Sequence, residues 1–135
     1  MTDIKMQTGE SIVQRGLLQW PCKISLVPTR APYFDGANLL IAADCTAFAY
    51  KGFHNELSRG RIILTGCPAV SKENYTEKLA NIIRNNDIKS IRIVRMDAGC
   101  CTSLESAARE AVRQSGKFIP WQIITVSTEG KISED

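Results

Sequence analysis

Short apolar runs alternate with longer amphipathic stretches along the chain. The runs are rich in Ile, Leu and Val, and several are nearly continuous in apolar residues, which is typical of strands covered on both faces. The pattern predicts strands over residues 22–27, 38–43, 61–65, 90–96 and 121–127.

Helical periodicity fills the spaces between the later runs. The first predicted apolar helix face consists of Tyr75, Leu79, Ile82 and Ile83. The second consists of Leu104, Ala107, Ala108, Ala111 and Val112. A shorter helical candidate covers Phe53 to Arg59 and ends before Gly60.

The helix that follows residue 101 has the best-marked ends. Thr102 and Glu105 have the spacing of a capping box, and Gly116 is placed for a left-handed cap. Strands that alternate with helices in this rhythm indicate βαβ units. We therefore expect a three-layer α/β domain, Rossmann-like or flavodoxin-like, with a mostly parallel sheet of about five strands and helices on both faces.

A chain of 135 residues suits one compact domain. We expect a flexible amino-terminal segment over residues 1–16, a single α/β domain over 17–130 and a loose tail over 131–135.

Charge and hydropathy narrow the function classes. The 17 Lys and Arg residues exceed the 14 Asp and Glu residues by three, and they are scattered rather than gathered into a stripe for nucleic acid. The amino terminus lacks an apolar signal core, and no apolar run is long enough to span a membrane. We expect a cytoplasmic protein that binds no nucleic acid and has no membrane span.

Cysteines follow three of the predicted strands. Cys45 follows the second, Cys67 the third, and the adjacent pair Cys100 and Cys101 the fourth. Because the carboxyl ends of parallel strands meet at one edge, where such folds bind ligands, these four thiols are expected to share a site. Cys22 begins the first predicted strand, so it is expected on the opposite edge as a structural thiol.

Four converging thiolates match the ligand set of an iron-sulfur cluster or of zinc. Gly99 would give the backbone the freedom that vicinal ligands need. Cys67 and Cys101 lie near predicted helix starts, where backbone N–H groups stabilise a thiolate.

Other residues change the picture less. His54, the only histidine, is a weaker candidate metal ligand, a proton donor or a surface residue. Lys89, Arg92 and Arg95 alternate along one run, which indicates an edge strand or a charged rim. GxGxxG and GxxxxGK[ST] are both absent from the sequence, so the predicted fold does not imply a nucleotide.

Three stretches together resemble a known family: WPxxxxLVPxxAPYFxGAxLLIAADCxAFAYxxFH, ILTGCP and NDIKSIxIVRMxxxCC. They are similar to the carboxyl-terminal domain that follows a ferredoxin-like 4Fe-4S domain in iron-sulfur proteins of anaerobic bacteria and archaea. The similarity runs from about Leu17 to Trp121. It implies an iron-sulfur-associated redox protein.

The resemblance maps onto Cys45, Cys67, Cys100 and Cys101 one by one, with His54 as a weaker match. The ferredoxin-like part with its CxxCxxC clusters is missing from this sequence, so an electron relay would need a separate protein. The family often continues the cysteine pair with two glycines, whereas this chain has Thr102 and Ser103.

Four functional hypotheses remain open. The first is a small electron-transfer protein that binds a cluster, 4Fe-4S by preference, and meets a redox partner such as a ferredoxin-type protein or an oxidoreductase subunit. The second is a thiol enzyme or redox sensor, in which Cys100 and Cys101 form a reversible disulfide or Cys67 acts as a low-pKa nucleophile. The third is a zinc site on the same thiols, and the fourth is a partner-binding subunit without a cofactor. An apolar rim would favour a homodimer.

Overall fold

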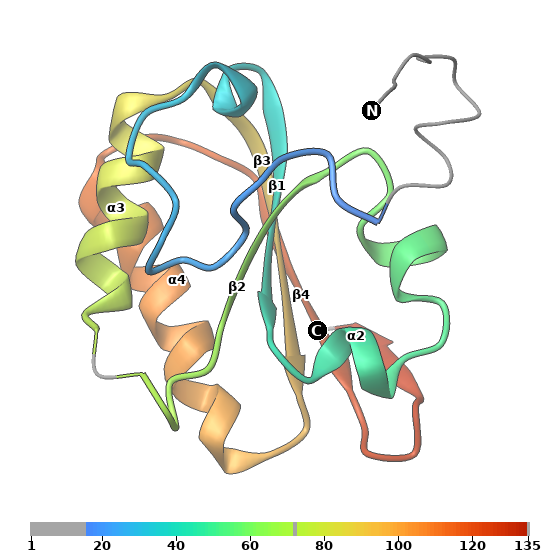
Figure 1. Ribbon diagram of the computed structural model, residues 1–135. Helices are drawn as coiled ribbons and strands as arrows, with labels where there is room; N and C mark the ends of the chain where they lie inside the picture. The colour runs from blue at the N-terminus through green and yellow to red at the C-terminus, as the bar shows by residue number, and fades with distance from the viewer. Residues whose placement is uncertain (1–15, 72, 135) are drawn as a thin grey trace, which may run out of the picture.

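The centre of the molecule is a five-stranded sheet in the order β2-β1-β3-β4-β5 (Figure 1). The computed structural model describes residues 16–71 and 73–134, so the expected amino-terminal segment lies, up to residue 15, outside the described residues. The strands are β1 (Ala37–Ala43), β2 (Ile62–Gly66), β3 (Ile88–Met96), β4 (Trp121–Val126) and β5 (Ile132–Glu134). The first four run parallel and β5 is antiparallel to β4, which confirms the predicted α/β fold with a mostly parallel sheet.

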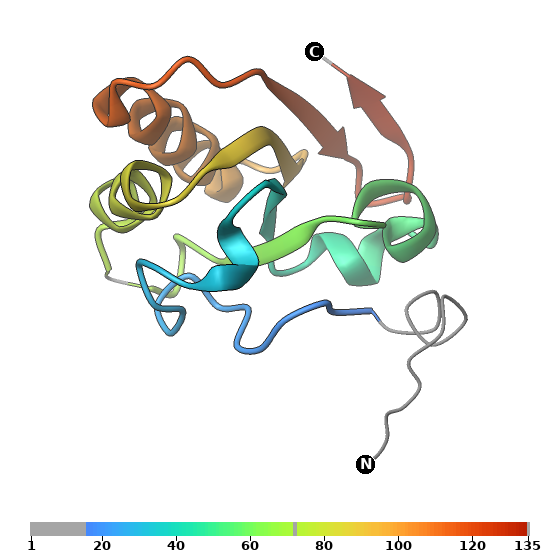
Figure 2. The same cartoon turned by 90° about the horizontal axis from the view of Figure 1, so that it is seen from above.

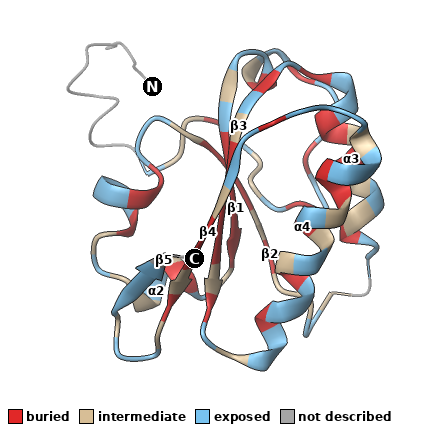
Figure 3. Ribbon diagram, turned by 180° about the vertical axis from the view of Figure 1, so that it is seen from behind, coloured by how far each residue is buried: buried red, intermediate tan, exposed pale blue. Residues whose placement is uncertain are grey.

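Helical elements cover both faces of this sheet. The long helices α3 (Tyr75–Asn85) and α4 (Thr102–Ser115) lie side by side on one face (Figures 1 and 2). The other face carries α2 (Thr46–Ala49) and the π-helical segment η3 (Phe53–Leu57). Buried residues follow the strands and the helix sides that face them (Figure 3). The predicted apolar faces of α3 and α4 are buried, except that Ala107 is half-buried.

The charged positions of β3 do not make it an edge strand. β3 lies between β1 and β4, so that interpretation of Lys89, Arg92 and Arg95 is wrong. Arg92 and Arg95 are three residues apart and therefore leave opposite faces of the strand. Their long side chains extend to polar groups: Arg92 binds Gln122 and the Leu57 carbonyl, and Arg95 binds Glu105 and the Ala98 carbonyl. Two arginines are therefore tolerated in a central strand.

The predicted first strand is also wrong. Only Lys23 forms a β-bridge, to Thr65 of β2: the Ile24 N–H donates to the Thr65 carbonyl at 2.8 Å, and the Thr65 N–H donates to the Cys22 carbonyl at 2.8 Å. The chain then turns, because the N–H of Val27 donates back to the Lys23 carbonyl. Ile24 and Val27 are buried three residues apart, which suits a turn against the sheet rather than an alternating strand.

The carboxyl-terminal residues expected as a loose tail form β5 instead. Its register pairs Thr125 with Ser133, and the connection closes as the Gly130 N–H donates to the Ser127 carbonyl at 3.0 Å. Gly130 has φ +84°, a left-handed value that glycine adopts without strain. Three residues are too few to show an alternating apolar and polar pattern, so this strand could not be predicted. The hairpin with β4 holds it in the sheet.

Of the two predicted ends of α4, the carboxyl-terminal cap is confirmed and the amino-terminal cap is not. Gly116 has φ +74° and forms the left-handed cap as predicted. The capping box is wrong: Cys101 occupies the N-cap position, and the Glu105 carboxylate binds Arg95 and Arg109 instead of the first turn. Two guanidinium partners compete successfully with a single backbone N–H for that carboxylate.

Candidate functional site

Three cysteine-bearing loops lie at the carboxyl end of the parallel strands, the lower edge of the sheet in Figure 1. Cys45 comes two residues after β1, Cys67 directly follows β2, and Cys100 and Cys101 form the 3-10 turn η4 (Gly99–Cys101) after β3. The chain leaves neighbouring β1 and β3 toward opposite faces, so the first and third loops flank a topological switch point (Figure 1). Crevices at such points are where open α/β sheets bind ligands.

The four thiols differ in exposure. Cys45 and Cys100 are exposed, Cys67 is half-buried, and Cys101 retains only 4% of its accessible surface. Two exposed apolar side chains follow these cysteines closely in the chain: Phe48 of α2, three residues after Cys45, at 92% exposure, and Val70, three residues after Cys67, at 80%. We call the surface formed by these three cysteine-bearing loops the rim. It presents both accessible sulfur and exposed apolar surface.

Tyr75 at the start of α3 holds the Cys67 loop. The Cys67 N–H donates to the Tyr75 hydroxyl at 3.1 Å. Gly66 makes room for this contact, because a Cβ on Gly66 would lie 2.6 Å from that hydroxyl oxygen. The Cys67 carbonyl in turn accepts from the N–H groups of Val70 and Ser71, so the loop turns immediately after the cysteine.

Arg95 holds the vicinal-cysteine loop. Its Nε donates to the Met96 carbonyl at 3.1 Å, and its Nη2 donates to the Ala98 carbonyl at 3.3 Å. Burial raises the pKa of the Cys101 thiol, and so does neighbouring Cys100, while a hydrogen bond with the Met96 backbone and the Arg95 charge act in the opposite direction. Cys101 is thus disfavoured as a free thiolate where it lies.

The turn before the pair does not depend on glycine. Among the described glycines, positive φ values fall at Gly36, Gly60, Gly116 and Gly130, and not at Gly99. Gly99 also has open space where a Cβ would stand. This conformation therefore does not use the freedom of a glycine, since a 3-10 turn has dihedral angles open to every residue.

Cys22 lies at the same end of the sheet as the other cysteines, not on the opposite edge. Its carbonyl accepts from Thr65, near the carboxyl end of β2, and the Thr65 hydroxyl donates to its Sγ at 4.0 Å. Next to it, the Lys23 amino group binds the Asp44 carboxylate at 2.7 Å, and this hydrogen bond raises the pKa of Lys23. The ion pair ties the amino-terminal segment to the residue before Cys45.

His54 is not brought to these loops. It lies in η3, and a Cβ on Gly16 would stand 3.0 Å from its ring. The segment from Gly16 runs along β2, with the Gln19 amide donating to the Ile63 carbonyl at 2.6 Å before Cys22 reaches Thr65. Gly16 and the His54 ring therefore lie toward the amino end of β2, away from its carboxyl end.

The described side chains can be checked for a group able to bind one metal ion. Within residues 16–71 and 73–134, no three His, Cys, Asp or Glu side chains are grouped closely enough to hold one ion. The four predicted thiols share an edge but do not converge on a point. Among these described residues a mononuclear zinc site is therefore not preformed, since structural zinc takes four ligands at about 2.0–2.3 Å.

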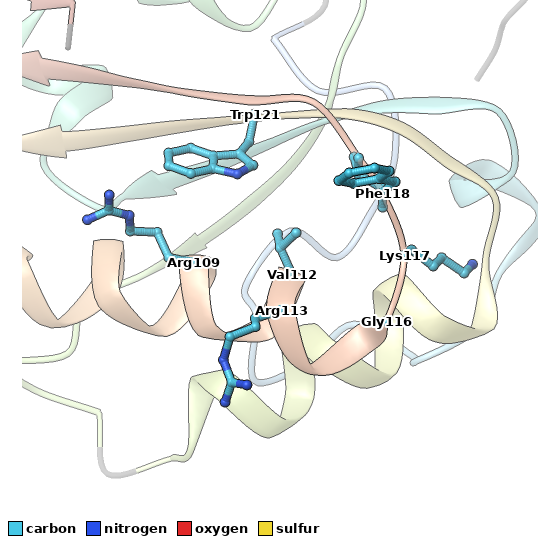
Figure 4. A pocket seen from close by; sticks show the side chains of 8 residues that line it. Arg109, Val112, Arg113, Gly116, Lys117, Phe118 and Trp121 are labelled. Carbon is cyan, nitrogen blue, oxygen red and sulfur yellow. The ribbon is translucent and has the colours of Figure 1, made fainter.

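A groove of about 370 Å³ lies elsewhere, between α4 and the amino end of β4. Figure 4 shows Trp121 above Arg109, with the guanidinium 5.2 Å from the ring centroid. The basic side chains that line the groove already have partners: Arg109 binds Glu105, Arg113 binds Glu110, and Lys117 binds two carbonyl oxygens of the α3 end. The groove thus offers little unpaired charge to a ligand.

Comparison with known proteins agrees with the topology. A family model described as "Rossmann-like domain" matches residues 31–135. The chain belongs to this Rossmann-like family. An uncharacterized protein of Archaeoglobus fulgidus is 30% identical over 115 residues, which cover 84% of this chain and 81% of that protein. No solved structure matches.

In this Rossmann-like chain, the described helices are too short or too polar for any of them to cross a lipid bilayer. Sequence reasoning missed three contributors to the rim: Cys22, Lys23 and Arg95. The apolar run around Cys22 gave no sign of which strand it would accompany. The carbonyl partners of Arg95 exist only once the loop is folded.

Proposed function

We propose that this protein is a small iron-sulfur protein that holds a cluster, 4Fe-4S by preference, through Cys45, Cys67, Cys100 and Cys101 and exchanges electrons with a partner protein. The observation that carries the proposal is the delivery of these four cysteines, on three separate loops, to the carboxyl end of the sheet. Two of those loops flank the switch point, where this fold class binds its ligands.

The donor set fits a cluster better than a single ion. Soft thiolates are the usual ligands of iron-sulfur clusters. The ligands of a cluster bind different iron atoms, so they need not meet at one point as the ligands of a single ion do. Cys101 fits least well, because its side chain is covered and the loop must turn it outward.

A bound cluster would supply one-electron exchange, and the surroundings of the rim suit a partner surface. The exposed Phe48 and Val70 flank Cys45 and Cys67. The resemblance of the ADC, GCP and CC stretches to domains that accompany ferredoxin-like modules of anaerobes supports a redox partner of that kind. This sequence has no CxxCxxC cluster of its own.

The test is iron and acid-labile sulfide content, with an optical spectrum, on protein purified without oxygen. About four of each per chain is expected for a 4Fe-4S cluster. Replacing Cys45, Cys67, Cys100 or Cys101 by serine should abolish or strongly reduce both contents. Cys22→Ser is the matched control, since it removes a thiol from the same edge and should leave them unchanged. Absence of iron and sulfide from the anaerobic wild-type protein would refute the proposal.

A second candidate, a thiol redox device, is favoured by one observation: Cys100 is exposed directly beside covered Cys101. A disulfide between them is disfavoured, because adjacent Cα atoms are about 3.8 Å apart, below the usual separation of disulfide-linked residues. An exposed Cys100 thiolate would more readily attack an external disulfide, forming a mixed disulfide with one half of it and releasing the other half as a thiolate. Metal-free protein in which Cys100 is alkylated much faster than every other thiol would favour this candidate.

A further inference from the structure

Arg95 is a mostly buried arginine next to the vicinal cysteines. Only 18% of its side chain is exposed, although it carries a full charge. It lies one residue before the end of β3, and its three donor groups point to three different partners: the Met96 carbonyl, the Ala98 carbonyl and the Glu105 carboxylate. Such a burial is tolerated because each hydrogen bond from a charged donor compensates lost hydration.

The Ala98 carbonyl joins this arginine to the cysteine pair. It accepts from Arg95 Nη2 at 3.3 Å and also from the Cys101 N–H at 3.0 Å. The second bond closes the 3-10 turn that places Cys100 outside and Cys101 inside. The guanidinium therefore fixes the carbonyl on which the turn depends.

Glu105 anchors the guanidinium from the helix side. Its Oε1 accepts from Arg95 at 2.9 Å and its Oε2 from Arg109 at 3.2 Å, and only 17% of its side chain is exposed. Arg109 is itself held over the Trp121 ring (Figure 4). The vicinal loop is thus connected to α4 and β4 by a continuous series of polar contacts.

We propose that Arg95 is a positioning residue for the vicinal pair: through the Met96 and Ala98 carbonyls it holds the loop so that Cys100 is accessible and Cys101 is covered. The importance of Arg95 for activity rests on the proposed function, whereas its hydrogen bonds to the Met96 and Ala98 carbonyls do not depend on that function. Arg95 sets which of the two thiols meets solvent, reagent or cofactor first.

Arg92 provides a matched comparison on the same strand. It is also a half-buried arginine that binds backbone oxygens, donating to the Leu57 carbonyl at 2.8 Å, but it does so at the end of η3 on the opposite face. Its Nε binds the Gln122 side chain at 2.9 Å. Loss of Arg92 costs similar contacts without touching the cysteine loop.

The experiment measures alkylation of each thiol by N-ethylmaleimide in the reduced, metal-free full chain, using mass spectrometry that separates Cys100 from Cys101. In the wild-type protein Cys100 should react far faster than Cys101. Arg95→Met should raise the Cys101 rate about tenfold, because the turn opens more often when its carbonyl anchors are lost. Arg92→Met should leave the ratio of the two rates unchanged.

Arg95→Lys separates position from charge. Lysine keeps the charge but cannot bind both carbonyls and Glu105 together, so positioning predicts a faster Cys101 rate here as well. A purely electrostatic role predicts a slower rate in Arg95→Met, since the favourable charge is gone, and no change in Arg95→Lys. Should Arg95→Met fail to fold, Arg95→Lys and Glu105→Gln carry the same expectation of a faster Cys101.

An unchanged ratio of Cys101 to Cys100 rates in the folded Arg95 variants overturns the inference, as does an equal change in Arg92→Met. These measurements use metal-free protein, so they do not depend on whether a cluster binds. Lack of iron and sulfide in the anaerobic protein would remove the proposed function and leave the positioning role intact.

Discussion

Gly66→Ala should destabilise the protein and loosen the Cys67 loop. The added methyl group would stand 2.6 Å from the Tyr75 hydroxyl oxygen, 2.8 Å from its Cζ and 3.1 Å from Ile24 Cδ1. Gly66 is not among the glycines with positive φ, so the substitution acts through these contacts rather than through backbone strain. The Tyr75 ring can yield only by giving up the Cys67 N–H, since it is otherwise buried.

The magnitude follows from that geometry. Inserting one methyl group into a well-packed site costs about 1 to 3 kcal/mol. The loss of the hydrogen bond to Cys67 is included in this range if the ring moves. In urea, a cost of this size lowers the unfolding midpoint by roughly 1 M for a domain of this length. Cys67 alkylation should also become faster in the native state, because its backbone anchor is lost.

Gly99→Ala is the control for this experiment. It adds the same methyl group next to another candidate cysteine, at a position where nothing lies within 4 Å of the new Cβ. Its effect on unfolding should stay within about 0.5 kcal/mol, as for most surface substitutions. Equal urea midpoints for the two variants would show that the packing of Tyr75 on Gly66 does not support the loop as described.

Three further predictions concern stability and are checked by urea unfolding. Asn86→Ala should cost about 1 to 3 kcal/mol, because buried Asn86 donates to two carbonyls, while Asn81→Ala, which removes one exposed contact, should cost much less. Gly116→Ala should cost about 1 kcal/mol because its φ of +74° is left-handed; a neutral effect would contradict that cap. Lys117→Met should cost about 1 kcal/mol by freeing carbonyls at the end of α3, and an unchanged midpoint would show those bonds to be dispensable.

The elements predicted best are those whose burial follows from local pattern. The runs that became β1 and β2 are almost entirely buried, and the left-handed cap at Gly116 needs only a glycine after the last helical turn. The run from Cys22 to Val27 is also largely apolar but forms one bridge. Apolar content reports burial, whereas strand formation also requires a partner in register, and that information lies elsewhere in the chain.

The sequence predicts at which end of the sheet the candidate cysteines lie, but it does not predict how each side chain is placed there. Placing Cys45, Cys67, Cys100 and Cys101 after strands is sufficient to assign them to the carboxyl end of a parallel sheet. The exposure of each thiol is not predictable in this way, because Cys100 and Cys101 are adjacent in sequence and yet one is exposed and the other buried. That difference arises from contacts made by Arg95, whose charge on an apolar run predicted only an edge strand or a charged rim.

The three loops of the rim are held by different contacts. Tyr75 holds the Cys67 loop, the Lys23–Asp44 ion pair holds the residue before Cys45, and Arg95 holds the vicinal pair. A ligand that gathers the thiols must therefore shift loops that are anchored separately, and it must also uncover Cys101. Each anchor can also be weakened alone, so substitutions at these positions measure the contribution of each loop to whatever binds at the switch point.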